Sequence, residues 1–126
     1  MPGDTDVTRL LTGIDPVLRP GRYVFVSGDL PTGVVPVATV REDEGLSAVV
    51  TGEDAEAHGL AGEFPCAWIT LRVASALEAV GFLAVIARAL TDAGIGTNAV
   101  AGFHHDHLFV PWGRRDDAMA VLRELA

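Results

Sequence analysis

The sequence contains no lysine, and its nine basic residues are all arginine. Without lysine the chain cannot form a Schiff base with a carbonyl substrate or supply the phosphate-binding lysine of a P-loop. It also contains a single cysteine, Cys66. One cysteine excludes an internal disulfide and a zinc site built from several thiolates. We interpret Cys66, which lies at the start of an expected strand, as a buried small apolar residue.

Long apolar runs are missing as well. With glycine counted, the longest covers the nine residues 79–87, far short of a membrane span. Residues 1–4 lack the basic and then apolar layout of a signal peptide. Seventeen acidic residues give a net charge of −8, which repels phosphate backbones and anionic membranes. We therefore expect a cytoplasmic protein that binds neither nucleic acid nor a membrane.

The 126 residues are enough for one domain or two small ones. In the first half, glycine and proline separate short segments with helical or strand-like patterns. These patterns predict a short helix within residues 7–18, a strand over 22–27, a loop around 31–36, a hairpin of 37–42 and 46–51, and a linker or short helix over 53–62.

The second half has a clearer pattern. Residues 67–73 alternate as in a strand, and the capping-box spacing of Ser75 and Glu78 predicts a helix from there to residue 93, closed by a left-handed Gly94. A second hairpin over 97–104 and 108–112 and a last helix from Asp116 follow. This order is a ferredoxin-like βαββαβ unit without its last strand, which the first half could supply, so we expect an α+β fold.

The expected helix over residues 79–93 is apolar nearly all round, with only Arg88, Thr91 and Asp92 plainly polar. A surface helix on a small sheet needs one apolar face, so two apolar stripes indicate a second packing partner. That partner is either the other half of the chain or another subunit. The alternative is that the many alanine side chains simply tolerate exposure.

Several motifs in the second half resemble the ACT domain, a small ligand-binding regulatory module. They are Val80-Gly81-Phe82-Leu83-Ala84, the pair Ala89-Leu90, and Gly94-Ile95 followed by Asn98. Residues 71–111, with the hairpin strand 46–50, resemble small stand-alone bacterial proteins with two ACT-like halves, related to the ACT regions of aspartate kinases and to tandem-ACT amino-acid sensors. The resemblance implies tandem ferredoxin-like halves, residues 1–62 and 63–126, with antiparallel sheets and helices on one face.

The resemblance also implies that an amino acid or a similar small molecule binds at an interface between ACT units, in a homo-oligomer such as a dimer. The site residues that it implies are Ser75, Ala76, Leu77, Glu78, Val80, Gly81, Phe82, Asn98 and His105. Such a site is chemically reasonable, because backbone donors at a helix N-terminus suit a carboxylate and Gly81 permits close backbone approach.

The densest polar cluster is formed by His104, His105, Asp106 and His107. Imidazole and carboxylate groups together can bind zinc or another transition metal. Neighbouring strand residues point to opposite faces, however, so at most two of these side chains converge unless the turn folds them together. Three interpretations stay open: structural turn residues, groups near the ligand or interface, and a metal site. We expect neither a bound metal nor a cofactor.

Other candidates for chemistry have simpler explanations. Residues 94–99 match a dinucleotide fingerprint by letters, but they leave a helix instead of entering one. Ser75 has no evident base to activate it as a nucleophile. We therefore expect a non-catalytic regulatory module that binds a small molecule such as an amino acid. The alternatives are an interaction or oligomerisation module without a ligand, and a metal-dependent enzyme that uses residues 104–107.

Overall fold

The computed structural model describes residues 3–126. Its helices are α1 (Val7–Thr12), α2 (Gly52–Ala57), α3 (Phe82–Asp92), α4 (Arg115–Glu124) and a 3₁₀ turn (Trp112–Arg114). Its strands are β1 (Pro16–Leu18), β2 (Tyr23–Ser27), β3 (Ala38–Glu42), β4 (Gly45–Thr51), β5 (Glu63–Leu71), β6 (Asn98–Ala101) and β7 (Asp106–Pro111). Within the described range, the seven strands form one antiparallel sheet in the order β3-β4-β2-β5-β7-β6, and β1 pairs with β5 beside that path.

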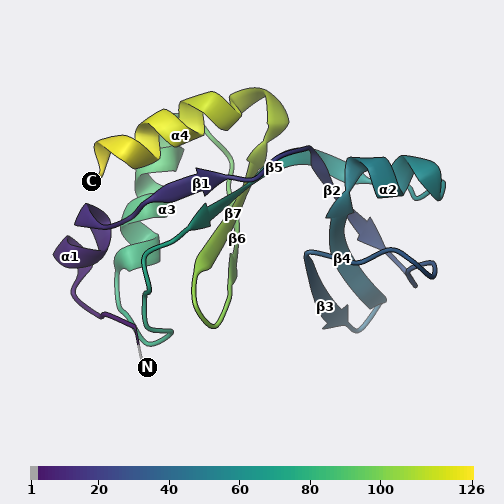
Figure 1. The fold of residues 1–126 in the computed structure, drawn as a ribbon, viewed down its shortest axis with the longest axis horizontal. Coiled ribbons are helices and arrows are strands. Elements are labelled where there is room, and N and C mark those ends of the chain that lie inside the picture. The colour runs from purple at the N-terminus through teal and green to yellow at the C-terminus, as the bar shows by residue number, and fades with distance from the viewer. Residues whose placement is uncertain (1–2) are drawn as a thin grey trace.

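The elements gather in two lobes (Figure 1). The first lobe contains β2, β3, β4 and α2, and the second contains α1, β1, α3, β6, β7 and α4. Strand β5 runs through both lobes: its residues 63–66 pair with β2, and its residues 69–71 pair with β1. This pairing confirms that the first half of the chain supplies the strand that the second half lacks, and it completes a ferredoxin-like unit.

In the second lobe, helices cover one face of the sheet. The side chains of Phe82, Ile86 and Leu90 form the buried stripe of α3, and they pack with Leu108 and Val110 of β7. The remaining buried members of this core are Leu10, Ile14, Ala67, Ile69, Leu71, Ile95, Ala118, Met119 and Leu122. Because Leu10 and Ile14 belong to this core, the N-terminal segment folds with the second lobe.

The C-terminal end of α3 is closed as the sequence predicts. Gly94 adopts the left-handed conformation, with φ of 73°. The Gly94 amide donates to the Thr91 carbonyl (2.9 Å) and the Ile95 amide donates to the Leu90 carbonyl (2.9 Å), which satisfies two free carbonyls of the last turn.

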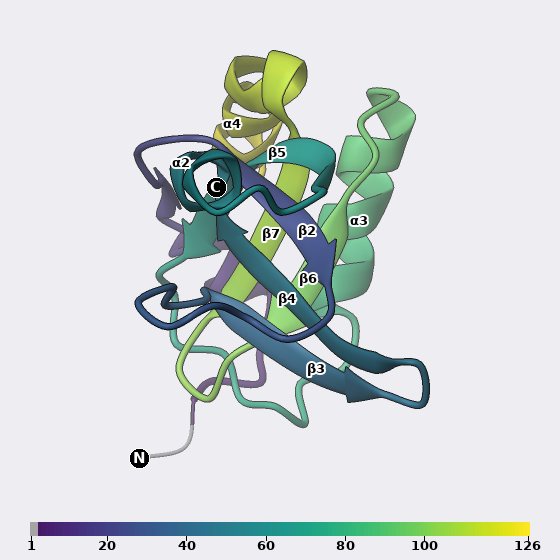
Figure 2. The same ribbon diagram turned by 90° about the vertical axis from the view of Figure 1, so that its right-hand side faces the viewer.

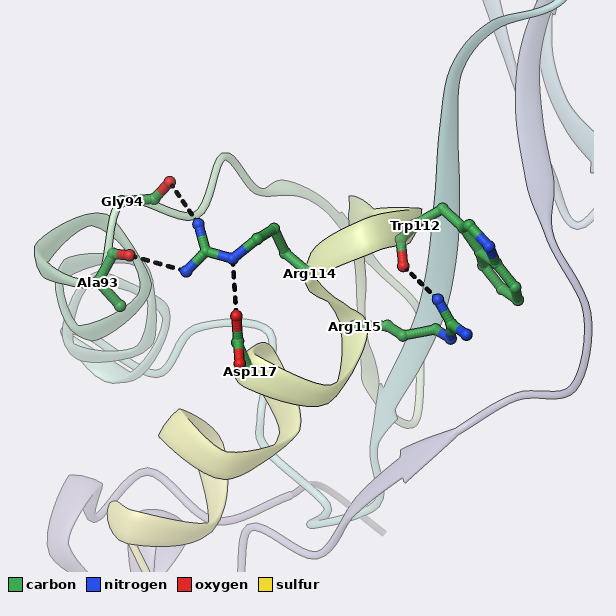
Figure 3. A network of polar contacts seen from close by, with 6 residues as sticks. All are labelled: Ala93, Gly94, Trp112, Arg114, Arg115 and Asp117. Atoms are coloured by element: carbon green, nitrogen blue, oxygen red, sulfur yellow. Dashed lines mark hydrogen bonds and ion pairs between the residues drawn. The ribbon is translucent and has the colours of Figure 1, made fainter.

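Arg114 adds a side-chain cap to the same helix end (Figure 3). Its guanidinium donates to the carbonyls of Ala93 (3.1 Å) and Gly94 (3.4 Å) and to the carboxylate of Asp117 (2.8 Å). A positive charge at a helix C-terminus also stabilises the helix dipole. The next residue, Arg115, lies 3.7 Å from the centroid of the Trp112 ring and donates to the Trp112 carbonyl. These contacts fix α4 against the end of α3.

The first lobe is smaller. Figure 2 shows β2, β4 and β3 side by side, with α2 at the end of β4. Its core is formed by short side chains, namely Val24, Val26, Val34, Ala48, Val50 and Ala55, with Leu30 and Leu60 packed against them. The connection between β2 and β3, residues 28–37, is a loop, as the sequence predicts.

A third apolar cluster lies on the sheet face opposite α3 and α4. It consists of Tyr23, Val49, Cys66 and Phe109, with Phe25, Val37, Phe64, Trp68 and Val100 packed around them. Its members come from both lobes, so the two lobes share this face. Cys66 is fully buried, as the sequence predicts, and burial raises the pKa of its thiol to about 12.

The structure corrects three boundaries. The N-terminal helix ends at Thr12, and the rest of the predicted segment forms β1, where its pairing with β5 outweighs the helical spacing. Strand β5 begins at Glu63 instead of residue 67, because β2 supplies a pairing partner there. The predicted helix from Ser75 begins only at Phe82. Among residues 3–126, no helix is long and apolar enough to cross a membrane.

Candidate functional site

The predicted ligand loop connects the end of β5 to α3. The expected capping box between Ser75 and Glu78 is wrong, because Gly81, with φ of 95°, precedes the first helical residue and no side chain caps that helix end. The core explains the difference. Little apolar burial favours a helical turn over residues 76–80, since Leu77 and Val80 are 68% and 86% exposed and only the small side chain of Ala79 packs against the core. The first turn of α3 therefore keeps backbone donors free of any side-chain cap.

A pocket of about 160 Å³ lies beside this loop. It is lined by Ser75, Ala76, Leu77, Ala79, Phe82 and Leu83 from the loop and α3, and by Ala101, Gly102 and Asp106 from the β6–β7 hairpin. Four of the nine residues that the sequence predicted for the site, Ser75, Ala76, Leu77 and Phe82, line this pocket.

The other five predicted residues lie outside the lining. Glu78, Val80 and Gly81 belong to the same loop, and Gly81 supplies the backbone conformation that turns it into α3. His105 lies in the hairpin turn, with its Nδ1 atom 3.4 Å from the Val73 carbonyl. Asn98 pairs with Phe109. Because side chains alternate along β6, Asn98 and Ala101 lie on opposite faces of the sheet, and Asn98 is turned away from the pocket.

Asp106 also lines the pocket, although the sequence did not place it among the nine predicted site residues and left the role of residues 104–107 open. Its Oδ2 atom accepts a hydrogen bond from the Ser75 hydroxyl (3.2 Å), so it holds the start of the loop against the hairpin. It pairs with Ala101 across the hairpin and with Leu71 of β5. The sequence signal for this position is the register of the hairpin. Once the turn is placed at residues 102–105, Asp106 lies opposite Ala101.

The N-terminal segment also contacts the loop. The Asp4 amide donates to the Ala74 carbonyl (2.8 Å), and the Ala76 amide donates to the Asp4 carbonyl (3.0 Å). Gly3 lies so close to the Ser75 backbone that a side chain at this position would clash with it. Residues 3–6 therefore position the loop that lines the pocket.

The polar cluster at residues 104–107 does not converge on one point. Asp106 bonds to Ser75, His105 lies near the Val73 carbonyl, and the ring of His104 lies edge-on to Phe103. Among residues 3–126, no group of three or more histidine, cysteine, aspartate or glutamate side chains is arranged to hold a metal ion.

His107 belongs to a separate network on the other face of the sheet. Its Nδ1 atom accepts a hydrogen bond from the Trp68 indole N–H (3.0 Å) and lies 3.1 Å from the Thr70 hydroxyl, which itself accepts from Arg19 (3.0 Å). Burial lowers the pKa of His107 below its ordinary value, and the positive charge of Arg19 acts in the same direction. The histidine ring is therefore kept neutral near pH 7.

A larger and shallower hollow, of about 650 Å³, lies on the first lobe. It is lined by Phe25, Val26, Ser27, Val40, Glu42, Ser47, Ala61 and Glu63. Glu42 accepts a hydrogen bond from the Ser47 hydroxyl. With two carboxylates and no basic side chain in its lining, this hollow disfavours an anionic ligand, so size alone does not make it the better candidate.

Exposed apolar side chains surround the pocket at Ser75. Leu77 and Val80 come from the loop, Leu83 from α3 and Phe103 from the hairpin turn, and Phe103 is 75% exposed. Val85 of α3 is also exposed, but it lines a different hollow, with Arg88 and Leu125. The helix therefore buries one stripe and leaves other apolar side chains in solvent, which leaves open the question of the second packing partner that the sequence raises.

Two family models match the chain, and both are described as ACT domain: one covers residues 2–67 and the other residues 63–124. A protein of unknown function from Vibrio cholerae, described as a "possible transport protein", is 38% identical over 95% of each chain, with a TM-score of 0.86. No protein with a curated functional description matched.

Two more distant structures share the fold. A protein from Agrobacterium tumefaciens is 21% identical, with a TM-score of 0.72 and 87% of each chain covered. The ligand-free regulatory subunit of aspartate kinase from Thermus thermophilus is 10% identical, with a TM-score of 0.66 over 90% of this chain and 98% of that one.

Proposed function

The chain belongs to the ACT-domain family, with one ACT domain matched in each half, and from this premise we propose that it is a non-catalytic regulatory module that binds an amino acid. The division of the sequence into residues 1–62 and 63–126 is part of the proposal, with β5 shared between the halves and with α1 and β1 of the first half packed in the second lobe. The binding site that we propose is the pocket between the loop at Ser75 and the β6–β7 hairpin.

The observation that carries the proposal is the pairing of opposite polarities across this pocket. The first turn of α3 offers backbone amides without a side-chain cap, and the positive end of the helix dipole favours a carboxylate there. Asp106 offers a carboxylate on the opposite wall, which suits an ammonium group. An amino acid carries an ammonium group and a carboxylate on the same α-carbon. The ammonium group suits the Asp106 wall, and the carboxylate suits the wall formed by the first turn of α3.

The rest of the pocket favours a small apolar side chain. Leu77, Phe82 and Leu83 line it, and its volume of about 160 Å³ is close to that of an apolar cavity that binds benzene. The lining contains no arginine, so a basic or acidic side chain of the ligand would lose its hydration without gaining a partner other than Asp106.

A thermal-shift panel of the twenty amino acids tests the proposal. A ligand present at 100 times its dissociation constant should raise the free energy of unfolding by about 2.7 kcal/mol. Asp106→Asn should weaken the binding of that ligand at least tenfold, because it removes the charge that faces the ammonium group. Asp92→Asn, at the exposed C-terminal end of α3, is the matched control and should leave binding unchanged.

No shift with any of the twenty at millimolar concentration would contradict the amino-acid proposal. So would full binding by a folded Asp106→Asn protein. A shift that appears equally with aliphatic amines lacking a carboxylate would show that the helix terminus does not take part.

The second candidate function is an interaction module, and the exposed apolar side chains around the pocket favour it. A second copy seated on this surface would cover the pocket and provide the dimer that the ACT resemblance implies. Light scattering should then give a dimer, and Val80→Glu, at a position that is 86% exposed, should give a monomer. Val35→Glu, in the first-lobe loop and 80% exposed, is the control and should remain dimeric. A monomer before any substitution would contradict this candidate.

A further inference from the structure

A second, smaller hollow lies between the lobes, on the sheet face opposite the pocket at Ser75. Its volume is about 150 Å³. The first lobe contributes Val37 and Ala38, and the second contributes Trp68, Val100, His107 and Phe109. Because side chains alternate along a strand, Val100 and His107 lie on the opposite face from their neighbours Ala101 and Asp106, which line the first pocket. The two hollows therefore open on opposite faces of the sheet, and their linings share only Gly102 at the hairpin turn.

The walls of this hollow are aromatic and apolar. The rings of Trp68 and Phe109 are stacked, with centroids 6.4 Å apart and planes inclined by 22°. Phe109 is fully buried, and Val100 packs against the same cluster. The volume matches that of an apolar cavity that admits benzene, so the space suits one six-membered ring.

The imidazole of His107 faces this apolar space, and its neutral ring has one defined tautomer. The indole N–H of Trp68 can only donate, so the Nδ1 atom of His107 must be the acceptor of that hydrogen bond (3.0 Å). The imidazole proton is therefore carried by Nε2, which donates. No hydrogen bond from Nε2 to another group is formed within residues 3–126, so this donor is available to a ligand.

Gly102 keeps the donor accessible. A Cβ atom at this position would lie 3.1 Å from Nε2 of His107 and 2.9 Å from the His105 carbonyl oxygen. Any side chain there would cover the Nε2–H group as well as crowd the turn. A positive charge lies beside the Trp68 wall of the hollow. It belongs to the Arg19 guanidinium, which lies 5.2 Å from the centroid of the Trp68 ring and donates to Thr70.

We propose that this hollow is a second binding site, and that its ligand is a small aromatic carboxylate. The ring of the ligand packs against Trp68 and Val100, and one carboxylate oxygen accepts the hydrogen bond of the His107 Nε2–H group. Arg19 favours the negative charge of the ligand over a neutral or positive one. The linings of this site and of the amino-acid pocket have only Gly102 in common, so no side chain lines both.

Benzoate is the probe for a direct test. The chain has two tryptophans, and Trp112 stacks on Arg115 at the start of α4, so Trp112→Phe leaves Trp68 as the sole fluorescent reporter. Titration with benzoate should change the Trp68 fluorescence in a saturable way at millimolar concentration and shift the NMR signal of its indole N–H. Benzylamine, which has the same ring and the opposite charge, should produce neither effect.

A matched pair of variants locates the binding. Ala38→Leu fills the hollow from the first lobe and should weaken benzoate binding at least tenfold. Thr39→Leu places the same side chain at the next residue of β3, on the other face of the strand. This variant should bind benzoate as the unsubstituted protein does. Circular dichroism shows whether both variants are folded.

Three results would overturn the proposal. They are a benzoate titration without saturation, an equal response to benzylamine, and unchanged benzoate binding by folded Ala38→Leu protein. None of them bears on the amino-acid panel, because that measurement probes the other face of the sheet.

Discussion

The two lobes use the same order of strands but connect the first pair differently. In the second lobe, β5 is joined to β6 by the eleven-residue helix α3, whereas in the first lobe β2 is joined to β3 by the loop 28–37. The loop contains Gly28, Pro31, Gly33 and Pro36, which interrupt any helix. The comparison teaches that the candidate amino-acid site follows the connecting helix: the N-terminus of α3 has no side-chain cap, whereas the N-terminus of α2 in the first lobe is capped by the Thr51 hydroxyl.

The cores of the two lobes also differ, because helices cover the second lobe where a loop covers part of the first. The second lobe packs long side chains such as Leu90 and Leu108 beneath two helices, while the first lobe packs mainly valine and alanine beneath α2 and the loop. Burial of apolar area is the main favourable term in folding, so most of the stability should come from the second lobe.

The largest predicted effect tests this difference in cores with matched leucine truncations. Leu108→Ala removes a fully buried side chain of the second lobe and should lower the free energy of unfolding by about 2–5 kcal/mol. Leu60→Ala removes a partly buried side chain of the first lobe and should cost clearly less. Chemical denaturation measures both. Equal losses would show that the lobes contribute equally and would break the comparison.

A smaller effect is expected at the C-terminal end of α3, the helix that the first lobe lacks. Arg114→Ala removes two bonds to helix carbonyls and one ion pair, and it should cost about 1 kcal/mol. Arg88→Ala removes an exposed ion pair on the same helix and should cost about 0.5 kcal/mol or less. A thermal or urea unfolding series that ranks the two variants the other way would contradict the capping role of Arg114.

The smallest predicted effect is a pH dependence of stability, which arises at His107 on the sheet face that both lobes share. The pKa of His107 is lowered by burial, then by His105 and Arg19, against an opposing effect of Asp106. As pH falls below about 6.5, the unfolded chain binds a proton that the folded chain resists. Stability is therefore complete above that pH and decreases as pH falls toward the folded pKa of His107.

Unfolding measured between pH 5 and pH 7 checks the sign of this dependence. His107→Gln should flatten the dependence, whereas His58→Gln, at the exposed end of α2, should retain it. An unchanged slope in the His107 variant would show that another group is responsible.

The sequence predicts features that depend on neighbouring residues. The β3–β4 hairpin follows from the turn at residues 43–45, and the end of α3 follows from Gly94 behind an apolar stripe. The α+β class likewise follows from the order of local patterns, and the tandem arrangement of ACT domains is implied by the family resemblance; both are confirmed.

Apart from the strand that the first half supplies to the second, features that depend on distant pairing could not be predicted. The capping box at Ser75 satisfies a local rule, but the large buried side chains of this segment begin at Phe82, and the helix begins there. Asp106 enters the pocket because the register of β7 against β5 and β6 places it opposite Leu71 and Ala101. That register is set by packing across the sheet, and the spacing of histidines in the sequence does not reveal it.

The shared strand β5 has a mechanical consequence. It is nine residues long and spans at most roughly 30 Å, and it is interrupted near its Glu63 end, where Phe64 has a φ of 56° and the register against β2 shifts. Its Leu71 end leads directly into the loop that lines the pocket, and its Glu63 end is paired with Phe25 inside the first lobe. A displacement of the loop would therefore meet a bend in β5 before it reached the strands of the first lobe, so the two lobes are joined by one strand but not by one straight strand.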